Sequence, residues 1–495
     1  MGNKLQYIIL GLFFIGGILF SGYFEDTVFL IMNAVLYLGF SVVIWQGKSL
    51  TLQWVHLPVI LIVLLYWISC IYAIDVEASV LEAARVSSLI PISLLAAMLP
   101  REGLNRIMAL LPWGTGFMVL AGIALQLERN GRLESTLQYA NALAIVCLVA
   151  LIIGILNDMV RKSTIQLALL TINAVGLLLT FSRSVWVLWF IAVVVLILII
   201  PRLRSAAAML RIGVAHAAGL LIAMLVKGDM LFFVHRVSSI QVQTSEFQIR
   251  LVYWKDSVTM FLDHWIGGIG GGGWALLQYS YQSQPYYVKF IHNHYIQLLL
   301  DIGLIGGCSM IVLVLMFYKQ AVTKVRLSED SDKSLAKGVV VIVTVLFLHA
   351  GFDFDLTYPL LFALLVCVVM TVFPAGKIIT INRLRLAVTI SLAGIIAGIF
   401  MWIGIAYHWK DEGIQAVRNG EFQYALEQLQ KAEQLIPWSS SILYETAKVY
   451  VHMGNHARND SFYKLAETKL LKATGMVSEK RIYTDLLIEL RKVEK

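Results

Sequence analysis

Long apolar runs constrain the fold of this chain more than any other feature of its sequence. They recur from Tyr7 to the residues just before Tyr407, and each is close to the roughly 20 apolar residues that a membrane-spanning helix needs. Of all residues 59% are hydrophobic and 14% are charged, whereas a soluble domain carries about 25% charged residues. The sequence therefore predicts an all-α, polytopic membrane helix bundle.

The apolar runs divide into about 12–13 transmembrane helices. Their approximate cores begin at Tyr7, Thr27, Trp54, Ser79, Asn105, Gln138, Thr164, Val185, Leu210, Tyr295, Gly338, Thr357 and Leu386. The runs near Ser79 and Leu210 are shorter or richer in small residues than the others.

Changes in polarity along the chain predict four parts. Residues 1–226 hold the N-terminal transmembrane helices, and residues 227–293 form a large loop with the candidate catalytic residues. Residues 294–406 hold the C-terminal transmembrane helices, and residues 407–495 form a small polar domain of helical repeats.

The distribution of lysine and arginine predicts how the chain is oriented. Most basic residues of the short connecting segments lie on the side that holds Lys4, Lys48 and Lys319. The opposite short segments hold only Arg85, Arg129, Arg132 and Arg183. Because basic loops stay in the cytoplasm, we expect a cytoplasmic N-terminus and an extracytoplasmic location for the 227–293 loop and the C-terminal tail.

The tail carries one copy of a pattern typical of tetratricopeptide (TPR) repeats. The matching residues are Trp409, Gly413, Ala425, Leu429, Ala432 and Pro437. Small residues at these positions let two antiparallel helices approach closely, and the proline ends the second helix. A plain helical hairpin is the alternative. TPR repeats bind other proteins, so we expect a protein partner for the tail.

An outward-facing membrane enzyme has no ATP available, so a synthetic reaction there needs an activated substrate. A lipid-linked sugar diphosphate meets this need. The enzyme must then neutralise the charge of the diphosphate and deprotonate an acceptor hydroxyl. Arginine suits the first task because its guanidinium binds phosphate oxygens in pairs, and histidine suits the second.

The predicted outer side offers such groups in three places. Arg183 directly precedes an apolar run, Arg250 and Trp254 lie one helical turn apart in the long loop, and His292–Asn293–His294 precedes another apolar run that contains Asp301. Polar groups at the edge of hydrocarbon are costly, which favours a functional role. The alternatives are an interface anchor for Arg183, a surface arginine stacked on Trp254, and structural histidines.

The loop also contains six glycines within Gly267–Gly273. Such a segment can form a nest of backbone amides that binds an anion, or it can serve as a flexible connector. His292 and His294 lack a third ligand at zinc-like spacing, so we expect no metal site, and no cofactor motif is present. The four cysteines lie in apolar runs and show no disulfide pattern.

Taken together, these segments resemble the O-antigen ligase and O-antigen polymerase superfamily. The resemblance covers roughly residues 1–400. It rests on Ser182–Arg183, Arg250 with Trp254, the glycine-rich segment, His292–Tyr295 with Asp301 and Gly303, Leu137–Ala144, and His349–Asp353.

The resemblance implies that the protein transfers a glycan from undecaprenyl diphosphate to an acceptor hydroxyl, with inversion and without a metal ion. It implies a bacterial cytoplasmic membrane location and contact with membrane lipids, but not with nucleic acid. Its implied catalytic residues are His292, as the acceptor's base, and Arg183 and Arg250, which would hold the diphosphate. The substrate-binding residues that we predict are Tyr139, Asn141, Trp254, Asn293, His294, Asp301 and Asp353.

Two other functions remain open. A transporter for lipid-linked oligosaccharides or small anions would place ionisable residues in the middle of its spans, and few charges lie there in this sequence. A non-catalytic scaffold would depend on the tail for its function. The sequence does not distinguish a polymerase from a ligase.

Overall fold

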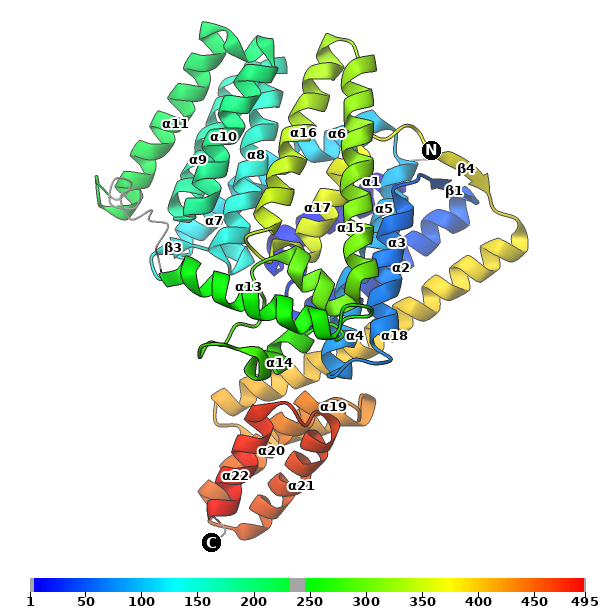
Figure 1. The fold of residues 1–495 in the computed structure, drawn as a ribbon, viewed down its shortest axis with the longest axis vertical. Helices are drawn as coiled ribbons and strands as arrows, with labels where there is room; N and C mark the ends of the chain where they lie inside the picture. Colours follow the sequence, from blue (N-terminus) through cyan, green and yellow to red (C-terminus); the bar gives the residue numbers. More distant parts are fainter. Residues whose placement is uncertain (1–3, 232–244, 494–495) are drawn as a thin grey trace.

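The computed structural model describes residues 4–231 and 245–493. They form a helical body with a smaller helical domain at one end (Figure 1). This architecture confirms the predicted all-α polytopic bundle. The predicted loop at 227–293 includes residues 232–244, which lie outside the described part of the chain.

The first half of the body runs from the N-terminus to residue 227. Its elements are α1 (Lys4–Leu19), η1 (Ser21–Tyr23), α2 (Asp26–Gly47), β1 (Ser49–Leu52), α3 (His56–Ser69), α4 (Val76–Ser87), α5 (Leu89–Met98), α6 (Arg101–Ala109), α7 (Leu111–Ala124), β2 (Glu128–Arg129), β3 (Arg132–Leu133), η2 (Ser135–Leu137), α8 (Ala140–Val160), α9 (Thr164–Leu179), α10 (Arg183–Ile199), η3 (Pro201–Arg204) and α11 (Ala206–Lys227).

The second half of the body and the tail follow. Their elements are α13 (Ser245–Asp263), α14 (Gly273–Tyr281), α15 (His294–Leu327), α16 (Asp330–Ala350), η4 (Asp355–Thr357), α17 (Pro359–Met370), β4 (Lys377–Thr380), α18 (Arg383–Arg418), α19 (Phe422–Leu435), α20 (Ser440–Ala457), α21 (Asp460–Met476) and α22 (Arg481–Val493).

Within the described residues, eight helical segments are long and apolar enough to cross a membrane. They are α2, the pairs α4–α5 and α6–α7, α8, α11, α15, α16 and α18. Five shorter apolar helices accompany them, namely α1, α3, α9, α10 and α17. Each predicted core begins inside one of these segments or within two residues of its start.

Two helices form the centre of the body. Nearly every side chain of α8 is buried, and all residues of α17 are buried. Helices that are apolar on every side pack inside a bundle, which explains their position. With twelve residues, α17 is only about 18 Å long. The segment 351–358, which carries Asp353 and the short 3-10 helix η4, leads directly into it.

The glycine-rich segment packs against a break in α15. The backbone of α15 leaves helical geometry at Ile302 and Gly303, where the amides of Ile269 and Gly270 donate to the carbonyls of Leu300 and Asp301. A Cβ on Gly303, which has a φ of +70°, would lie 2.0 Å from the carbonyl oxygen of Ile266. Only glycine permits this approach, so the segment has a packing role.

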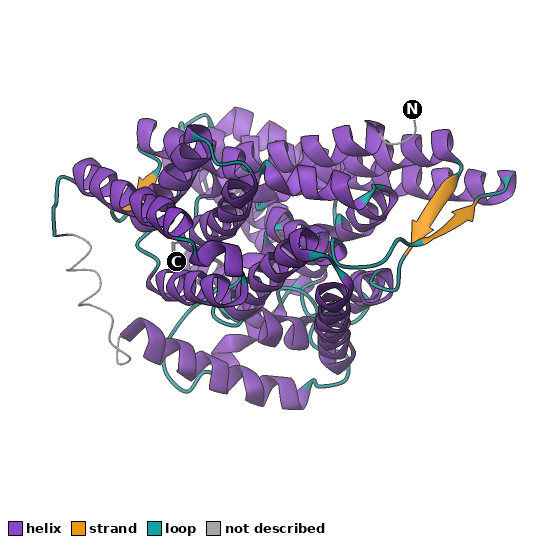
Figure 2. Ribbon diagram, turned by 90° about the horizontal axis from the view of Figure 1, so that it is seen from above, coloured by secondary structure: helices purple, strands orange, loops and turns teal. Residues whose placement is uncertain are grey.

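The described residues include two small antiparallel sheets, of which one connects distant parts of the chain. β1 pairs with β4 in a register that joins Ser49 to Thr380, and β2 pairs with β3 as a hairpin. The β1–β4 pair lies at the edge of the body (Figure 2). At the opposite end of the upright helices, α13 lies across them, close to α14 and the tail (Figure 1).

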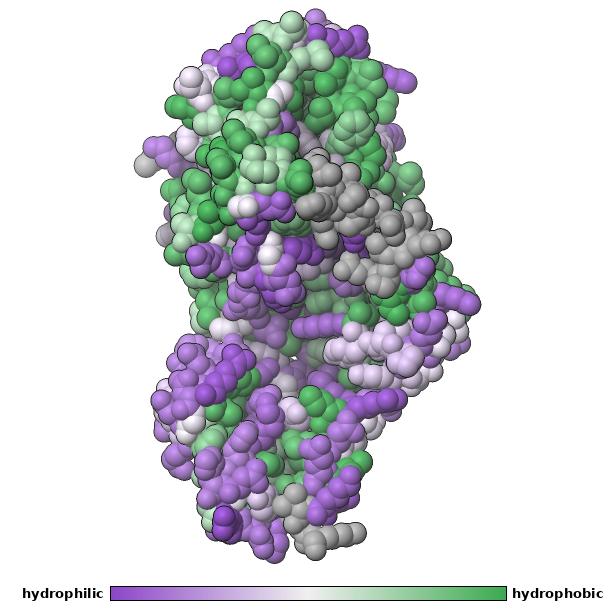
Figure 3. Space-filling view, turned by 90° about the vertical axis from the view of Figure 1, so that its left-hand side faces the viewer, coloured by the Kyte–Doolittle hydropathy of each residue, from purple (hydrophilic) through white to green (hydrophobic). Residues whose placement is uncertain are grey.

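A single long helix, α18, joins the body to the tail. It packs along α2, where a Cβ on Gly404 would lie 3.3 Å from the Cβ of Leu30. Small residues at such contacts let helices approach closely. Hydrophobic side chains cover much of the body, whereas the tail surface is mostly hydrophilic (Figure 3). The tail consists of antiparallel helices, and its assignment to the TPR class remains a prediction.

The carboxylate of Glu77, near the start of α4, anchors the tail to the body. It accepts hydrogen bonds from the Tyr407 hydroxyl at 2.6 Å and from Ser439, Ser440 and Ser441 at 2.5–3.1 Å. The three serines lie at the start of α20, whose amides and dipole favour an anion. Lys480 adds an ion pair with Asp75 at 3.1 Å.

We predict that Glu77→Gln loosens the tail. An amide retains the volume but loses the charge that five donors address, and hydrogen bonds to charged groups contribute about 1.5–3 kcal/mol. The purified variant should unfold at a lower temperature, and protease should release its tail faster. Glu427→Gln is the control, since Glu427 forms an exposed pair with Lys431. Equal behaviour of the two variants would contradict the anchoring role.

Candidate active site

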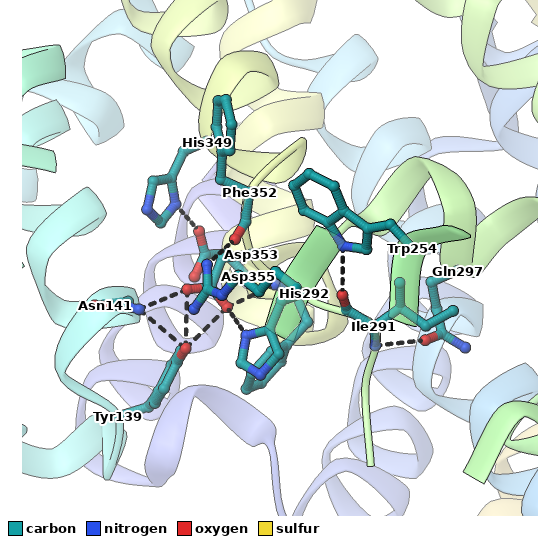
Figure 4. A network of polar contacts seen from close by, with 12 residues as sticks. Tyr139, Asn141, Trp254, Ile291, His292, Gln297, His349, Phe352, Asp353 and Asp355 are labelled. Atoms are coloured by element: carbon teal, nitrogen blue, oxygen red, sulfur yellow. Dashed lines mark hydrogen bonds and ion pairs between the residues drawn. The ribbon is translucent and has the colours of Figure 1, made fainter. Parts of the chain in front are cut away.

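The carboxylate of Asp353 joins three segments that are far apart in the sequence. It accepts hydrogen bonds from the Tyr139 hydroxyl at 2.8 Å, from the Asn141 amide at 2.6 Å and from His292 Nδ1 at 3.0 Å. The side chain of Asp353 is 1% exposed and that of His292 is 22% exposed. Figure 4 shows these side chains converging on one point. We call Tyr139, Asn141, His292 and Asp353 the Asp353 cluster.

Local backbone geometry places the members of the cluster. Tyr139 is the extended residue before α8, and Asn141 lies in the first turn of that helix. His292 adopts a φ of +51°, a left-handed conformation that costs a non-glycine residue about 1–3 kcal/mol and is concentrated at functional sites. The next residue, Asn293, caps α15 by accepting from the amides of Tyr295 and Ile296.

The charge state of Asp353 follows from its neighbours. Burial alone would raise its pKa, but the hydrogen bond from His292 and the charges of His292, His349 and Arg250 outweigh burial. The pKa of Asp353 therefore lies well below its ordinary value. An ionised carboxylate only accepts hydrogen bonds, so Nδ1 of His292 carries a proton. In the neutral imidazole, Nε2 then has a free lone pair.

Tyr139 remains a hydrogen-bond donor. Burial, and secondly the negative charge of Asp353, raise the pKa of Tyr139 well above its ordinary value. Its hydroxyl and the amide of Asn141 hold both oxygens of Asp353. These two residues therefore orient the carboxylate that in turn orients His292.

Arg250 and Trp254 reach the same place from α13. Arg250 donates to the carbonyl oxygen of Phe352, next to Asp353, at 2.6 Å. Trp254 donates to the carbonyl oxygen of Ile291, next to His292, at 2.9 Å (Figure 4). The structure thus brings both residues to the backbone that carries the cluster. Their placement one turn apart on a helix agrees with the sequence pattern.

A second histidine–aspartate pair lies beside the first. His349, at the end of α16, bonds through Nδ1 to Asp355, and both side chains are almost fully buried. Burial raises the pKa of Asp355, and the charge of His349 offsets only part of this increase. Asp355 is absent from the predicted site. Its signal was available, since a second aspartate two residues after Asp353 in an apolar region is costly unless it is paired.

Arg132 connects the cluster to the segment that carries Arg183. It donates to the side-chain oxygen of Asn141 at 2.6 Å and to the carbonyl oxygen of Thr180 at 2.8 Å. Arg183 begins α10 three residues later. It is partly buried and lies outside the hydrogen bonds that define the Asp353 cluster. Sequence reasoning used Arg132 only as an outer charge and missed this bridge.

His294 and Asp301 occupy a different environment from His292. Both line a cavity of about 530 Å³ between the body and the tail. Asp301 accepts hydrogen bonds from Tyr66 at 3.0 Å and from Gln297 at 2.9 Å. The structure therefore does not bring these two residues into the Asp353 cluster. Among the described residues, no three histidine, cysteine or carboxylate side chains lie close enough together to hold a metal ion.

The comparisons with known proteins address the family of the chain. Residues 167–311 match a family model described as O-antigen ligase. This match supports membership of the O-antigen ligase/polymerase family. No curated protein sequence matches the chain. The matched segment contains Arg183, Arg250 and His292, whereas Tyr139 and Asp353 lie outside it.

The family match and the apolar helices together indicate a multi-pass membrane protein. The match supports glycan transfer of the ligase or polymerase kind as the general activity. Lipid-linked glycans and membrane lipids fit this family and these helices as the protein's substrates and surroundings.

We predict that Asp353→Asn destabilises the purified protein by about 2–4 kcal/mol, because the three side-chain donors and the amide of Phe354 address a buried charge. The folded pKa of Asp353 is depressed, so its stabilisation is present above the unfolded value of about 3.9 and is lost only below that pH. The difference in melting temperature should thus not shrink between about pH 8 and about pH 5.

The control for this experiment is Asp263→Asn, because Asp263 is an exposed carboxylate that also accepts a hydrogen bond, from Tyr281. A difference for Asp353→Asn that shrinks steadily between pH 8 and pH 5 would show that Asp353 titrates near neutral pH, against the assigned charge state.

Proposed function

We propose that the protein transfers a glycan from undecaprenyl diphosphate to an acceptor hydroxyl on the outer face of the bacterial cytoplasmic membrane. The observation that carries the proposal is the hydrogen bond from His292 to buried Asp353, with Arg250 bonded to the adjacent residue. This arrangement offers a base and a phosphate-binding cation on one short stretch of backbone. The family match supports the same class of reaction.

In the proposed reaction His292 acts as the general base. Its Nδ1–H bonds to Asp353, so Nε2 can take the proton of the acceptor hydroxyl. The acceptor oxygen then forms a bond to the anomeric carbon of the donor sugar as the bond from that carbon to the diphosphate oxygen breaks. Undecaprenyl diphosphate leaves with the electron pair. One displacement inverts the anomeric configuration and requires no metal ion in this scheme.

The arginines would stabilise the leaving diphosphate. One guanidinium nitrogen of Arg250 is bonded to Phe352, and this bond fixes the direction of the group. Arg183 lies at the start of α10, where helix amides also favour an anion. Preorganised charge of this kind stabilises a developing anion strongly because it needs no reorganisation.

The orientation of the protein is part of the proposal. Figure 1 draws α13 and the tail at the same end of the body, and the positive-inside rule assigns that end to the extracytoplasmic side. We also propose that the tail is a TPR-like domain that binds a protein partner. The proposed division of the chain into four parts, which end at residues 226, 293, 406 and 495, is the one that the sequence predicts.

We predict that Arg250→Ala and His292→Ala reduce glycan transfer by at least about 100-fold while the protein still accumulates in the membrane. Arg183→Lys should also be impaired, because lysine lacks the planar fork of donors. Mass analysis of lipid-linked glycans in cells measures the effect. Accumulated single repeat units would indicate a polymerase, and accumulated long chains would indicate a ligase.

Arg129→Ala and His408→Ala are the matched controls for these variants. Both side chains are more than half exposed, and each pairs with a glutamate away from the cluster. Normal product in the Arg250 and His292 variants would refute the proposed reaction. Normal product in Arg183→Lys alone would reduce Arg183 to a membrane-interface residue.

The orientation predicts the accessibility of two exposed positions. Gln284 lies between α14 and α15, and Glu329 lies between α15 and α16. A membrane-impermeant maleimide should label Gln284→Cys in intact cells and Glu329→Cys only after lysis. The unmodified chain gives the background from its own cysteines. Reversed labelling would place the Asp353 cluster on the cytoplasmic side and exclude the proposed location.

A further inference from the structure

The cavity between the body and the tail is separate from the Asp353 cluster. Its volume of about 530 Å³ falls within the roughly 300–1,000 Å³ typical of ligand sites. Its walls come from α4, α14, the start of α15 and the tail around Lys480. Phe290 lines the cavity and stacks on Phe354 at 4.8 Å, and Phe354 meets the His292 ring at 5.0 Å. One layer of aromatic rings thus separates the cavity from His292.

His294 marks the cavity as a binding site. The residue is 4% exposed, and among the described residues neither of its ring nitrogens has a hydrogen-bond partner. A buried polar group without a partner is destabilising. Because one nitrogen of neutral imidazole donates and the other accepts, two hydroxyls of a ligand, one accepting and one donating, would satisfy the ring.

Aromatic rings and cations surround the mouth of the cavity. Tyr279 stacks with Tyr287, and the guanidinium of Arg481 lies 4.2 Å from the centre of the Tyr279 ring. Lys289 lies over the ring of Phe290 at 5.4 Å. In the described part of the chain, no carboxylate comes within 4.0 Å of the charged nitrogens of Lys289 or Arg481. These two exposed cations are therefore available to a ligand.

Most acidic groups of the wall are already engaged. Asp26 and Glu82 pair with Arg85, and Asp75 pairs with Lys480. Glu77 accepts five hydrogen bonds from α18 and α20, and Asp301 is held by Tyr66 and Gln297. Glu479 remains at the rim. Among the described lining residues, the exposed charged groups at the mouth that form no ion pair are thus Lys289 and Arg481, together with the single carboxylate of Glu479.

We propose that this cavity binds an acidic saccharide, such as a sugar chain that carries carboxylates. The rings offer faces for sugar, Lys289 and Arg481 offer charge for its acidic groups, and His294 offers two nitrogens that can each bond to a separate sugar hydroxyl. The inference rests on the proposed function, because it names the acceptor glycan as the occupant. It also gives the docked tail a role, since the tail supplies part of the wall.

The test measures binding directly on the purified full-length chain. The probes are a hexamer of galacturonic acid and neutral maltohexaose, measured by titration calorimetry. We expect the acidic hexamer to bind at least about tenfold more tightly than the neutral one, and a Lys289→Gln/Arg481→Gln variant to lose this preference. The control is Lys464→Gln/Lys472→Gln, which removes two exposed charges from α21 outside the cavity.

Three results would overturn the inference. They are equal binding of the two hexamers, unchanged preference in the Lys289/Arg481 variant, and displacement of the acidic hexamer by phosphatidylglycerol in nanodiscs, which would assign the cavity to a lipid headgroup. Arg250→Ala should bind the acidic hexamer normally. If the acidic hexamer fails to bind while Arg250→Ala abolishes glycan transfer, only the proposed cavity ligand is refuted. If the hexamer binds as expected while Arg250→Ala leaves glycan transfer normal, only the proposed reaction is refuted.

Discussion

The buried carboxylate of Asp353 holds together the part of this structure on which its function depends. Its partners lie at the start of α8, before α15 and within the segment that leads into α17. An anion at 1% exposure is stable only when donors surround it. The requirement for donors therefore fixes the side chain of His292 and the loop that Arg250 contacts. Stability and chemistry share one set of contacts here.

The same principle explains how a polar tail is attached to a hydrophobic body. Glu77 is a second buried carboxylate, and its donors come from α18 and from the first residues of α20. The long helix α18 sets the distance between body and tail, and Glu77 sets their relative orientation. A rigid attachment of this kind allows the tail to form one wall of a cavity instead of trailing as an independent module.

The positions of the spans could be read from the sequence because an apolar run is a local signal. His292 could also be singled out, since a polar residue beside hydrocarbon is costly. Arg250 was predicted from its spacing to Trp254 in the polar loop, and Asp353 only from the family resemblance. Their partners could not be deduced. Tyr139 and Asp353 are 214 residues apart, and Glu77 and Ser441 are 364 residues apart, with no local pattern to connect them.

The sequence could not decide whether the glycine-rich segment is an anion-binding nest or a flexible connector. The segment packs against the broken backbone of α15, and this contact is visible only in the fold. Asn293 was predicted to bind substrate, although an asparagine directly before an apolar helical run is also a typical helix N-cap.

The central claim is that His292 and Arg250 act together on a lipid-linked diphosphate at the Asp353 cluster. A cryo-electron microscopy structure of the full chain in nanodiscs with a non-hydrolysable undecaprenyl diphosphate sugar tests it most directly. The account predicts the diphosphate within hydrogen-bond distance of the Arg250 guanidinium, with the anomeric carbon facing Nε2 of His292. Density for the diphosphate at the opposite end of the bundle, or beyond the reach of both residues, would contradict it.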